Sequence, residues 1–168
     1  MKNILTKLFF LALFLPAKSF AQDINGIWRG QLYVDSTKTF LPYEVLISNA
    51  NGKLMGYSHI TFEEKGRKEV GVRSILIKRQ GDKILLEDQN FIDYNFADDP
   101  PINIKKTMVV TIEKVDNLMN LNGNWTTNKT KIYTAATGTV KLQYVKEYKT
   151  TTLYKKLKNL QLTDKLFL

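Results

Sequence analysis

Few side chains in this 168-residue chain could carry out chemistry. The chain has no cysteine and one histidine, His59, so it offers neither a thiol nucleophile nor the usual Cys/His zinc sets. A Ser–His–Asp triad would have to use His59, which directly follows Ser58 in a strand-like segment. A single histidine in a strand is more often packed or exposed than catalytic, so we do not expect a triad.

Two pairs of adjacent carboxylates, Glu63-Glu64 and Asp98-Asp99, are the other candidates for acid–base or metal chemistry. Neighbours in sequence seldom face each other across a substrate, which argues against acid–base catalysis. The second pair precedes two prolines but lacks the regular oxygen-ligand spacing of a calcium loop, and no glycine-rich phosphate loop opens a helix. We therefore expect no catalytic residue, no metal and no cofactor, and a protein that is not an enzyme.

The elements that position the side chains are predicted to be strands, because apolar and polar residues alternate with period two from Gly26 onward. Turn residues interrupt the alternation, and Asn51-Gly52 favours a two-residue type I′ hairpin. The segment 63–68 reads as a charged turn, and 93–103 as a loop, since its two prolines cannot donate to a ladder. The predicted strands are residues 26–34, 43–47, 53–60, 69–78, 83–92, 104–115, 118–127 and 139–148.

Eight consecutive strands joined mostly by tight turns predict an all-β fold, an antiparallel up-and-down barrel, because closure removes the exposed edges. A two-sheet sandwich is the alternative, and only the 93–103 segment could supply its long crossover. Leucines at helical spacing within 151–168 predict a short amphipathic C-terminal helix packed against the barrel. The expected organisation is one domain over 22–168, with strands in 22–148 and the helix and tail in 149–168.

An apolar leader precedes the strands. Two lysines are followed by a continuous apolar run over 8–15 and by Ser19-Phe20-Ala21, which has small residues where a signal peptidase reads. The run is shorter than the about 20 apolar residues of a membrane span, so residues 1–21 are predicted to be a cleaved secretory signal, with an uncleaved anchor as the alternative. The mature protein would begin at Gln22, be secreted or periplasmic, and have no cysteine for a lipid anchor.

The net charge of +9 includes three lysines of this leader, and without them 22 basic and 16 acidic residues leave +6. The lysines are spread along the strands, which is typical of a solvated face. A nucleic-acid partner is not expected, because no basic patch is interleaved with aromatic residues. Weak attraction to an anionic envelope surface is compatible with this charge, and the sequence does not specify the oligomeric state.

The motif Gly26-Ile27-Trp28 stands a few residues after the expected mature start, on the first of the eight strands. In this motif, in strand count and in its terminal helix, the chain resembles the lipocalin and calycin superfamily, as a distant bacterial exported member. The resemblance implies that Trp28 plugs the tapering closed end of the barrel, while Gly26 lets backbones approach closely. The last strand departs from the family pattern, because it has no arginine to stack on the tryptophan.

Two non-enzymatic functions fit this reading. The first is non-covalent binding of a small, largely apolar molecule inside the barrel, which has room for one such ligand if its interior side chains are not all large. The alternative is an envelope interaction module with a solid barrel, which binds a protein or glycan through its loops, the 93–103 loop first. The expected ligand-binding residues are Leu32, Tyr43, Tyr57, Tyr94, Phe96, Met108 and Trp125.

Overall fold

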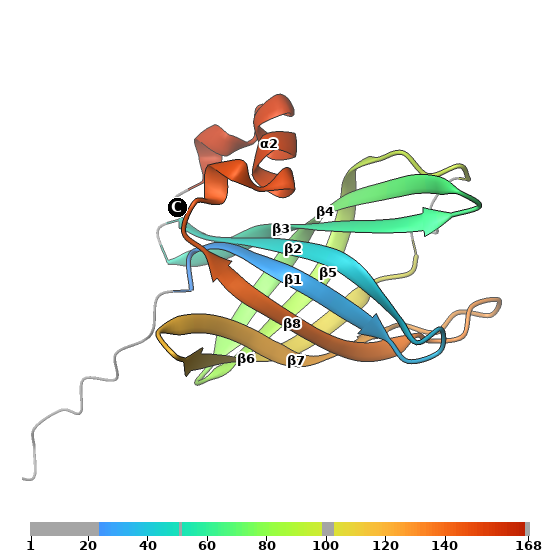
Figure 1. The fold of residues 1–168 in the computed structure, drawn as a ribbon, viewed down its shortest axis with the longest axis horizontal. Helices are drawn as coiled ribbons and strands as arrows, with labels where there is room; N and C mark the ends of the chain where they lie inside the picture. Colours follow the sequence, from blue (N-terminus) through green and yellow to red (C-terminus); the bar gives the residue numbers. More distant parts are fainter. Residues whose placement is uncertain (1–23, 51, 99–102, 167–168) are drawn as a thin grey trace, which may run out of the picture.

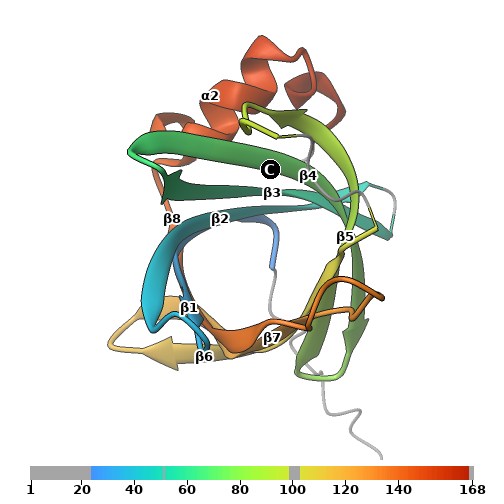
Figure 2. The same ribbon diagram turned by 90° about the vertical axis from the view of Figure 1, so that its right-hand side faces the viewer.

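The computed structural model describes residues 24–50, 52–98 and 103–166, so the predicted leader lies outside the described residues. Each strand pairs antiparallel with the next and the last pairs with the first, which closes the sheet into a barrel (Figures 1 and 2). This confirms the predicted fold class. The elements are β1 Gly26–Val34, β2 Thr39–Ala50, β3 Lys53–Glu64, β4 Arg67–Gln80, β5 Lys83–Tyr94, β6 Lys106–Val115, β7 Leu118–Thr127, β8 Thr137–Val145, the 3-10 helices η2 Tyr148–Thr150 and η3 Thr163–Lys165, and the α-helix α2 Thr152–Asn159.

The hairpin predicted at Asn51-Gly52 joins β2 to β3. Ala50 pairs with Lys53, so the connection has two residues. Gly52 has a φ of +83°, a conformation that costs glycine little because it has no Cβ. The turn residues therefore fix the register of this strand pair, and with it the face to which each side chain of β3 points.

The charged segment 63–68 is mostly strand, which corrects its prediction as a turn. β3 and β4 extend until only Lys65 and Gly66 remain in the turn, both with positive φ. Glu63 lies opposite Lys68 across the ladder, and the next pair is also opposite in charge. Such cross-strand pairs stabilise an exposed ribbon without apolar residues, which is why the apolar pattern ended the strands too early.

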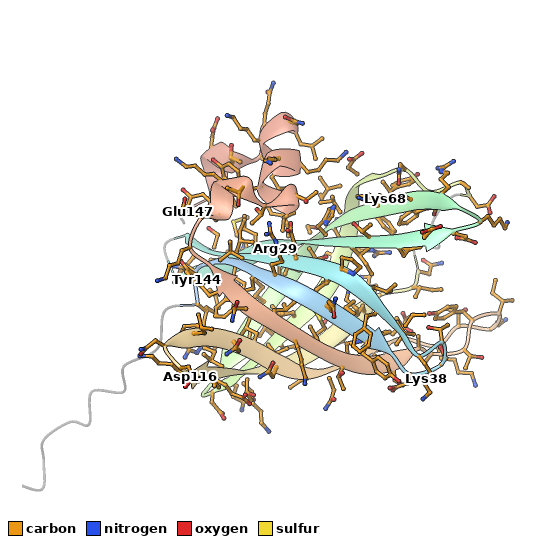
Figure 3. The ribbon with its side chains drawn as sticks, in the orientation of Figure 1. Arg29, Lys38, Lys68, Asp116, Tyr144 and Glu147 are labelled. Carbon is orange, nitrogen blue, oxygen red and sulfur yellow. The ribbon has the colours of Figure 1, made fainter. Side chains whose placement is uncertain are left out.

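Trp28 closes one end of the barrel. Its side chain is fully buried, and its Nε1 donates to the carbonyl oxygen of Ile24 at 3.0 Å. Its ring meets the ring of Tyr144 edge-on, with centroids 5.4 Å apart, and Figure 3 labels Tyr144 at this end. A Cβ on Gly26 would lie 2.5 Å from the Tyr144 ring, so a side chain there would displace that ring. Other buried side chains of this half are Val45, Ile47, Ile84, Leu86, Val110 and Leu121.

A second apolar cluster lies outside the barrel, where α2 covers β2 and β3 (Figures 1 and 2). Leu153 and Leu157 of the helix are fully buried there. Thr151 caps the helix by accepting a hydrogen bond from the Tyr154 N–H. The strand residues of this cluster are Ile27, Leu46, Tyr57 and Val72.

A buried carboxylate on β2 connects the helix to the barrel wall. Glu44 accepts a hydrogen bond from the backbone N–H of Leu153 at 2.6 Å and one from Arg29 Nε at 2.7 Å. Figure 3 shows Arg29 on the side of the barrel that carries α2. In the part of the chain that the structure describes, no helix has the length and hydropathy of a membrane span.

Candidate functional site

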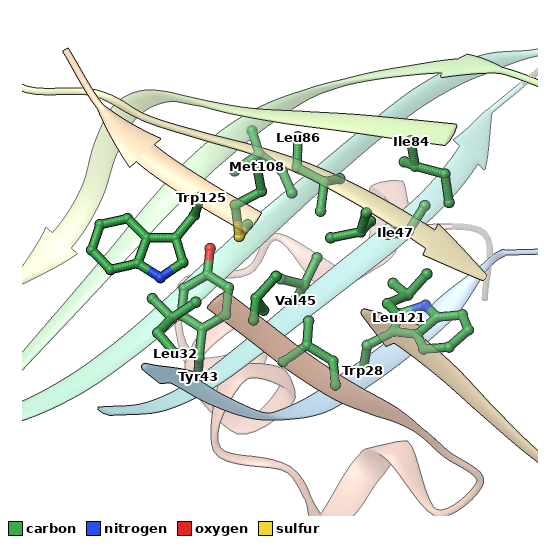
Figure 4. Close-up of a cluster of buried hydrophobic side chains, with 14 of the residues drawn as sticks. Trp28, Leu32, Tyr43, Val45, Ile47, Ile84, Leu86, Met108, Leu121 and Trp125 are labelled. Carbon is green, nitrogen blue, oxygen red and sulfur yellow. The ribbon is translucent and has the colours of Figure 1, made fainter. Parts of the chain in front are cut away.

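The half of the barrel opposite Trp28 contains a cavity of about 220 Å³. It lies near the end formed by the loops after β1, β3, β5 and β7, which we call the mouth. Figure 4 shows Trp125 and Trp28 at opposite ends of the buried cluster, with Tyr43 and Val45 between them. The cavity is lined by Leu32, Leu41, Ser58, Ile60, Gly71, Arg73, Asp88, Phe91, Phe96, Ile104, Lys106, Trp125 and Thr127.

Trp125 forms one wall of the cavity. Its indole Nε1 donates to the carbonyl oxygen of Tyr33 at 3.0 Å, and the ring lies against Gly138 of β8. A Cβ at Gly138 would lie 2.8 Å from Nε1, so the glycine makes room for the indole. The hydrogen bond and this close contact hold the ring in place, so the wall is preformed.

Aromatic side chains cover the other side of the mouth. The rings of Phe91, Tyr94 and Phe96 contact one another, with centroids between 5.4 and 5.7 Å apart. Phe62 of β3 joins them through Phe96 at 5.4 Å. Phe96 lies over Gly71, where a Cβ would come within 2.8 Å of its ring. These rings form an apolar rim around part of the opening.

β5 extends to Tyr94, so the loop predicted over 93–103 begins only at residue 95, and its start is fixed to β4 by hydrogen bonds. Asn95 Oδ1 accepts from the Val70 N–H at 2.7 Å, and its amide donates to the carbonyl of Lys68 at 3.3 Å. The buried carboxylate of Glu69 accepts from the Ala97 N–H at 3.0 Å. Phe96 is therefore held over the cavity by its two neighbours in sequence.

Three charged side chains lie together in the wall of the cavity. Asp88 Oδ2 is 3.5 Å from Lys106 Nζ and 3.8 Å from Arg73 Nε. All three side chains are nearly buried, with exposed fractions of 6%, 10% and 11%. Charges are rarely buried unless they are paired, because they lose their hydration. Two cations and one anion leave this cluster with a formal charge of +1.

Arg73 also bridges a gap in the barrel wall. The β5–β6 ladder joins residues 83–87 to residues 107–111, and no further pair is formed between these strands in the described residues. Beyond the ladder the Arg73 guanidinium donates to the carbonyls of Gln89 at 3.2 Å and Ile104 at 3.1 Å. Its Nη1 and Nη2 therefore take the place of missing backbone bonds.

Lys106, which lines the cavity, lies next to Tyr43 of the core, and we call this side of the cavity, toward Val45 and Trp28, its inner end. The ammonium nitrogen is 4.4 Å from the centroid of the Tyr43 ring. Burial by itself lowers the pKa of Lys106, but Asp88 and Tyr43 outweigh it and raise that pKa above 10.5. Burial raises the pKa of Tyr43 above 10. At neutral pH the lysine is therefore charged and the phenol keeps its proton.

Two buried oxygens of this group have no hydrogen-bond partner among the described residues. They are Tyr43 Oη and Asp88 Oδ1, on side chains that are 1% and 4% exposed. Buried polar atoms without partners are uncommon in folded proteins. Because these two oxygens lie beside a cavity, a ligand or a water molecule in the cavity can form hydrogen bonds with them.

The structure brings together four of the seven residues that the sequence singled out for ligand binding. Leu32, Phe96 and Trp125 line the cavity, and Tyr43 lies beside its inner end. Met108 is buried in the core with them, and Tyr94 is partly exposed on the rim, in contact with Phe91 and Phe96.

One of the predicted ligand-binding residues, Tyr57, lies outside the barrel interior. Its side chain belongs to the outer cluster under α2, with Leu153 and Leu157, and does not line the cavity. Its neighbour Ser58 lines the cavity instead. Because successive side chains of a strand point to opposite faces, a strand that turns Ser58 inward must turn Tyr57 outward.

Sequence reasoning missed Arg73, Asp88 and Lys106. For Lys106 a signal was present, since Met108 was placed inside and the strand period puts Lys106 on the same face. Arg73 lies at a break in register, where β4 shifts against β5 between Val72 and Ile75. Strand alternation therefore does not predict the face of the sheet to which the Arg73 side chain points.

A larger hollow of about 1000 Å³ lies on the outer face of β1, β7 and β8. It is an open depression that includes Tyr33, Leu118 and the 62% exposed ring of Phe40. Isolated exposed apolar residues are normal on soluble proteins, but several side by side form a surface that can bind a partner. The cavity in the barrel differs from it in having buried charges.

Among the described residues no three His, Asp or Glu side chains lie close enough to hold a metal ion. Comparison with known proteins places the chain in no group: no family model, curated protein or solved structure matches it. The cavity and its side chains are therefore the observations from which function is argued.

Proposed function

We propose that this protein is an exported, lipocalin-like carrier or sensor, not an enzyme, which binds a small, largely apolar molecule in the mouth half of its barrel. The observation that carries the proposal is the cavity of about 220 Å³, with its aromatic rim and buried polar groups. Ligand sites are typically concave and mostly apolar, with a few placed polar groups. The cavity has this composition.

The volume of the cavity sets the size of the ligand. An engineered apolar cavity of about 150 Å³ holds benzene, whereas pockets for drug-sized ligands occupy about 300–1,000 Å³. A cavity of about 220 Å³ therefore encloses roughly ten non-hydrogen atoms. A longer ligand would have to extend through the mouth past Phe91 and Phe96.

The two tryptophans allow a test of binding that also locates the ligand. Trp125 lines the cavity, and Trp28 lies at the closed end. In ¹H–¹⁵N spectra of the mature protein each indole N–H gives one signal, and the variant Trp125→Phe assigns them. Titration with short-chain alcohols, short-chain fatty acids and an envelope lipid extract should shift the Trp125 signal and leave that of Trp28 in place.

The same titration has a clear contradicting result. If no titrant moves the Trp125 signal, or if both indole signals move equally, the cavity is not the binding site. The carrier proposal would then be withdrawn in favour of the interaction module.

Export is the second part of the proposal, and it rests on the leader sequence. N-terminal sequencing of protein purified from its native host should begin at Gln22. Recovery of an intact Met1 would contradict the cleavage and the release of a mature protein, and would leave the uncleaved anchor.

The alternative function, an envelope interaction module that binds a protein or glycan, is favoured by the outer depression across β1, β7 and β8. Phe40, Val115 and Leu118 are exposed on or beside it. Under this alternative Phe40→Ser would abolish binding of the partner and leave small-molecule titrations unchanged.

A further inference from the structure

We infer that the inner end of the cavity is an anion subsite, where Lys106 Nζ and the hydroxyls of Tyr43 and Ser58 bind the single negative charge of a small amphipathic ligand. The ligand class is a monoanion with an apolar tail, such as a short alkanoate. The inference rests on the proposed function, since it names the chemistry of a molecule bound in that cavity.

The charge balance of the cavity wall points to an anion. The ionisable side chains in its lining are Arg73, Asp88 and Lys106, which sum to +1. An uncompensated charge is costly inside a protein. One ligand anion makes the group neutral, whereas an amine ligand would raise its charge to +2.

The unused hydrogen-bonding capacity lies at Lys106 and Tyr43. In the described residues the ammonium group of Lys106, which has three N–H donors, makes one weak hydrogen bond, to Asp88 Oδ2 at 3.5 Å, and Tyr43 also lies close enough to raise its pKa. Tyr43 Oη makes no hydrogen bond of standard geometry in the described part of the chain, and Ser58 and Lys106 lie close enough to it to lower the pKa of the phenol. Arg73, in contrast, directs its guanidinium to two backbone carbonyls that bridge the gap between strands. The anion is therefore assigned to Lys106 and Tyr43.

The position of Ser58 adds a third donor. It is 3% exposed, it lines the cavity, and its hydroxyl is close enough to Tyr43 to influence the titration of the phenol. Hydrogen bonds from these donors to a carboxylate of the ligand would be charge-assisted, and such bonds are about twice as strong as those between neutral groups. Three donors from β2, β3 and β6 at one end of an apolar cavity form a polar head-group site.

The remaining lining gives the ligand its direction. Leu32, Ile60, Phe91, Phe96 and Trp125 supply apolar surface between the charged end and the mouth. The anionic group therefore lies inside and the hydrocarbon part extends toward the rim. Asp88 Oδ1 is a buried carboxylate oxygen without a partner in the described residues, and it would favour an amine, so the experiment includes that possibility.

Three ligands of equal length test the inference: hexanoate, hexan-1-ol and hexylamine, titrated at pH 7.5 into the mature protein by calorimetry. We expect hexanoate to bind about tenfold or more tightly than hexan-1-ol, as hydrogen bonds to charged groups would produce, and hexylamine to bind most weakly. Equal affinities, or a preference for hexylamine, would overturn the anion subsite and leave the carrier function standing. If none of the three binds, both proposals fail.

Two variants assign the preference to residues. Tyr43→Phe removes one hydroxyl and keeps the ring, so it should weaken hexanoate several-fold and leave hexan-1-ol unchanged. Lys106→Met should abolish the preference for hexanoate, with Lys78→Met at an exposed position of β4 as the matched control. If both cavity variants are folded by circular dichroism and retain the full preference, the assignment is wrong.

Discussion

Trp28 is the single residue on which the closed end of the barrel most depends. It is fully buried, donates its indole N–H to Ile24 and packs edge-on against Tyr144. We expect Trp28→Ala to lower the free energy of unfolding by about 3–5 kcal/mol, because it leaves a large void. Urea denaturation of the mature protein measures this, with Phe40→Ala, at a 62% exposed position, as the control. An unchanged midpoint for Trp28→Ala would show that the Trp28 ring does not stabilise the fold.

His59 makes stability depend on pH. It is 5% exposed, and its Nε2 has no hydrogen-bond partner in the described residues. Burial lowers the pKa of His59 below 6.5, with a smaller opposing effect from Glu44 and minor lowering effects from Lys68 and Lys156. The unfolded chain therefore takes up a proton at a higher pH than the folded chain does.

The sign of this effect follows from proton linkage. The stability that neutral His59 provides is present above pH 6.5, and it declines as the pH falls from 6.5 toward the lowered pKa of the folded state. When the pH is lowered from 7.5 to 5.5, we expect the free energy of unfolding to fall less in His59→Gln than in the wild type, as measured by urea denaturation at each pH. Identical pH profiles for the two proteins would contradict the burial of a neutral imidazole.

Residue positions were predicted well where alternation is regular and poorly where a polar side chain points inward. Leu32 and Trp125 followed the strand period into the cavity. Lys106 was not predicted to be an interior residue, because a lysine in a strand is normally assigned to the solvent-exposed face. Its burial depends on Asp88, which comes close only when β5 and β6 are neighbours in the closed barrel.

At the scale of elements, α2 depends on the barrel for its stability. An isolated helix of eight residues is unstable in water, so Leu153 and Leu157, both fully buried against the strands, must hold it. We expect Leu157→Ala to cost about 2–5 kcal/mol. The exposed Lys158→Ala is the matched control, and equal denaturation midpoints for the two variants would show that the helix is not docked.

The helix was predicted from its leucine spacing, but its docking site was not. The surface that receives it includes Tyr57 and Val72, which strand alternation places on the outer face. In a barrel with a bare outer wall such residues would be exposed. An apolar residue at an outward position is thus a sequence signal for a covering element, and Tyr57 was instead assigned to the interior.

At the scale of the whole molecule, strand count and turn spacing were enough to predict closure. The hairpins at residues 51–52 and 116–117 have the two-residue connections that tie consecutive strands together. The hollow could not be predicted in the same way. The hollow depends on which side chains fill the interior at each height along the barrel axis. Trp28 fills one end of the barrel, whereas Trp125 at the opposite end lines the cavity wall and leaves the space beside it open.

The central claim is that the mouth half of the barrel is a preformed binding cavity, and a crystal structure of the mature protein with hexanoate tests it most directly. We predict density for the ligand between Trp125 and Phe91, with its carboxylate within hydrogen-bond distance of Lys106 Nζ. Density in the outer depression beside Phe40, or a mouth half filled by its own side chains, would contradict the claim.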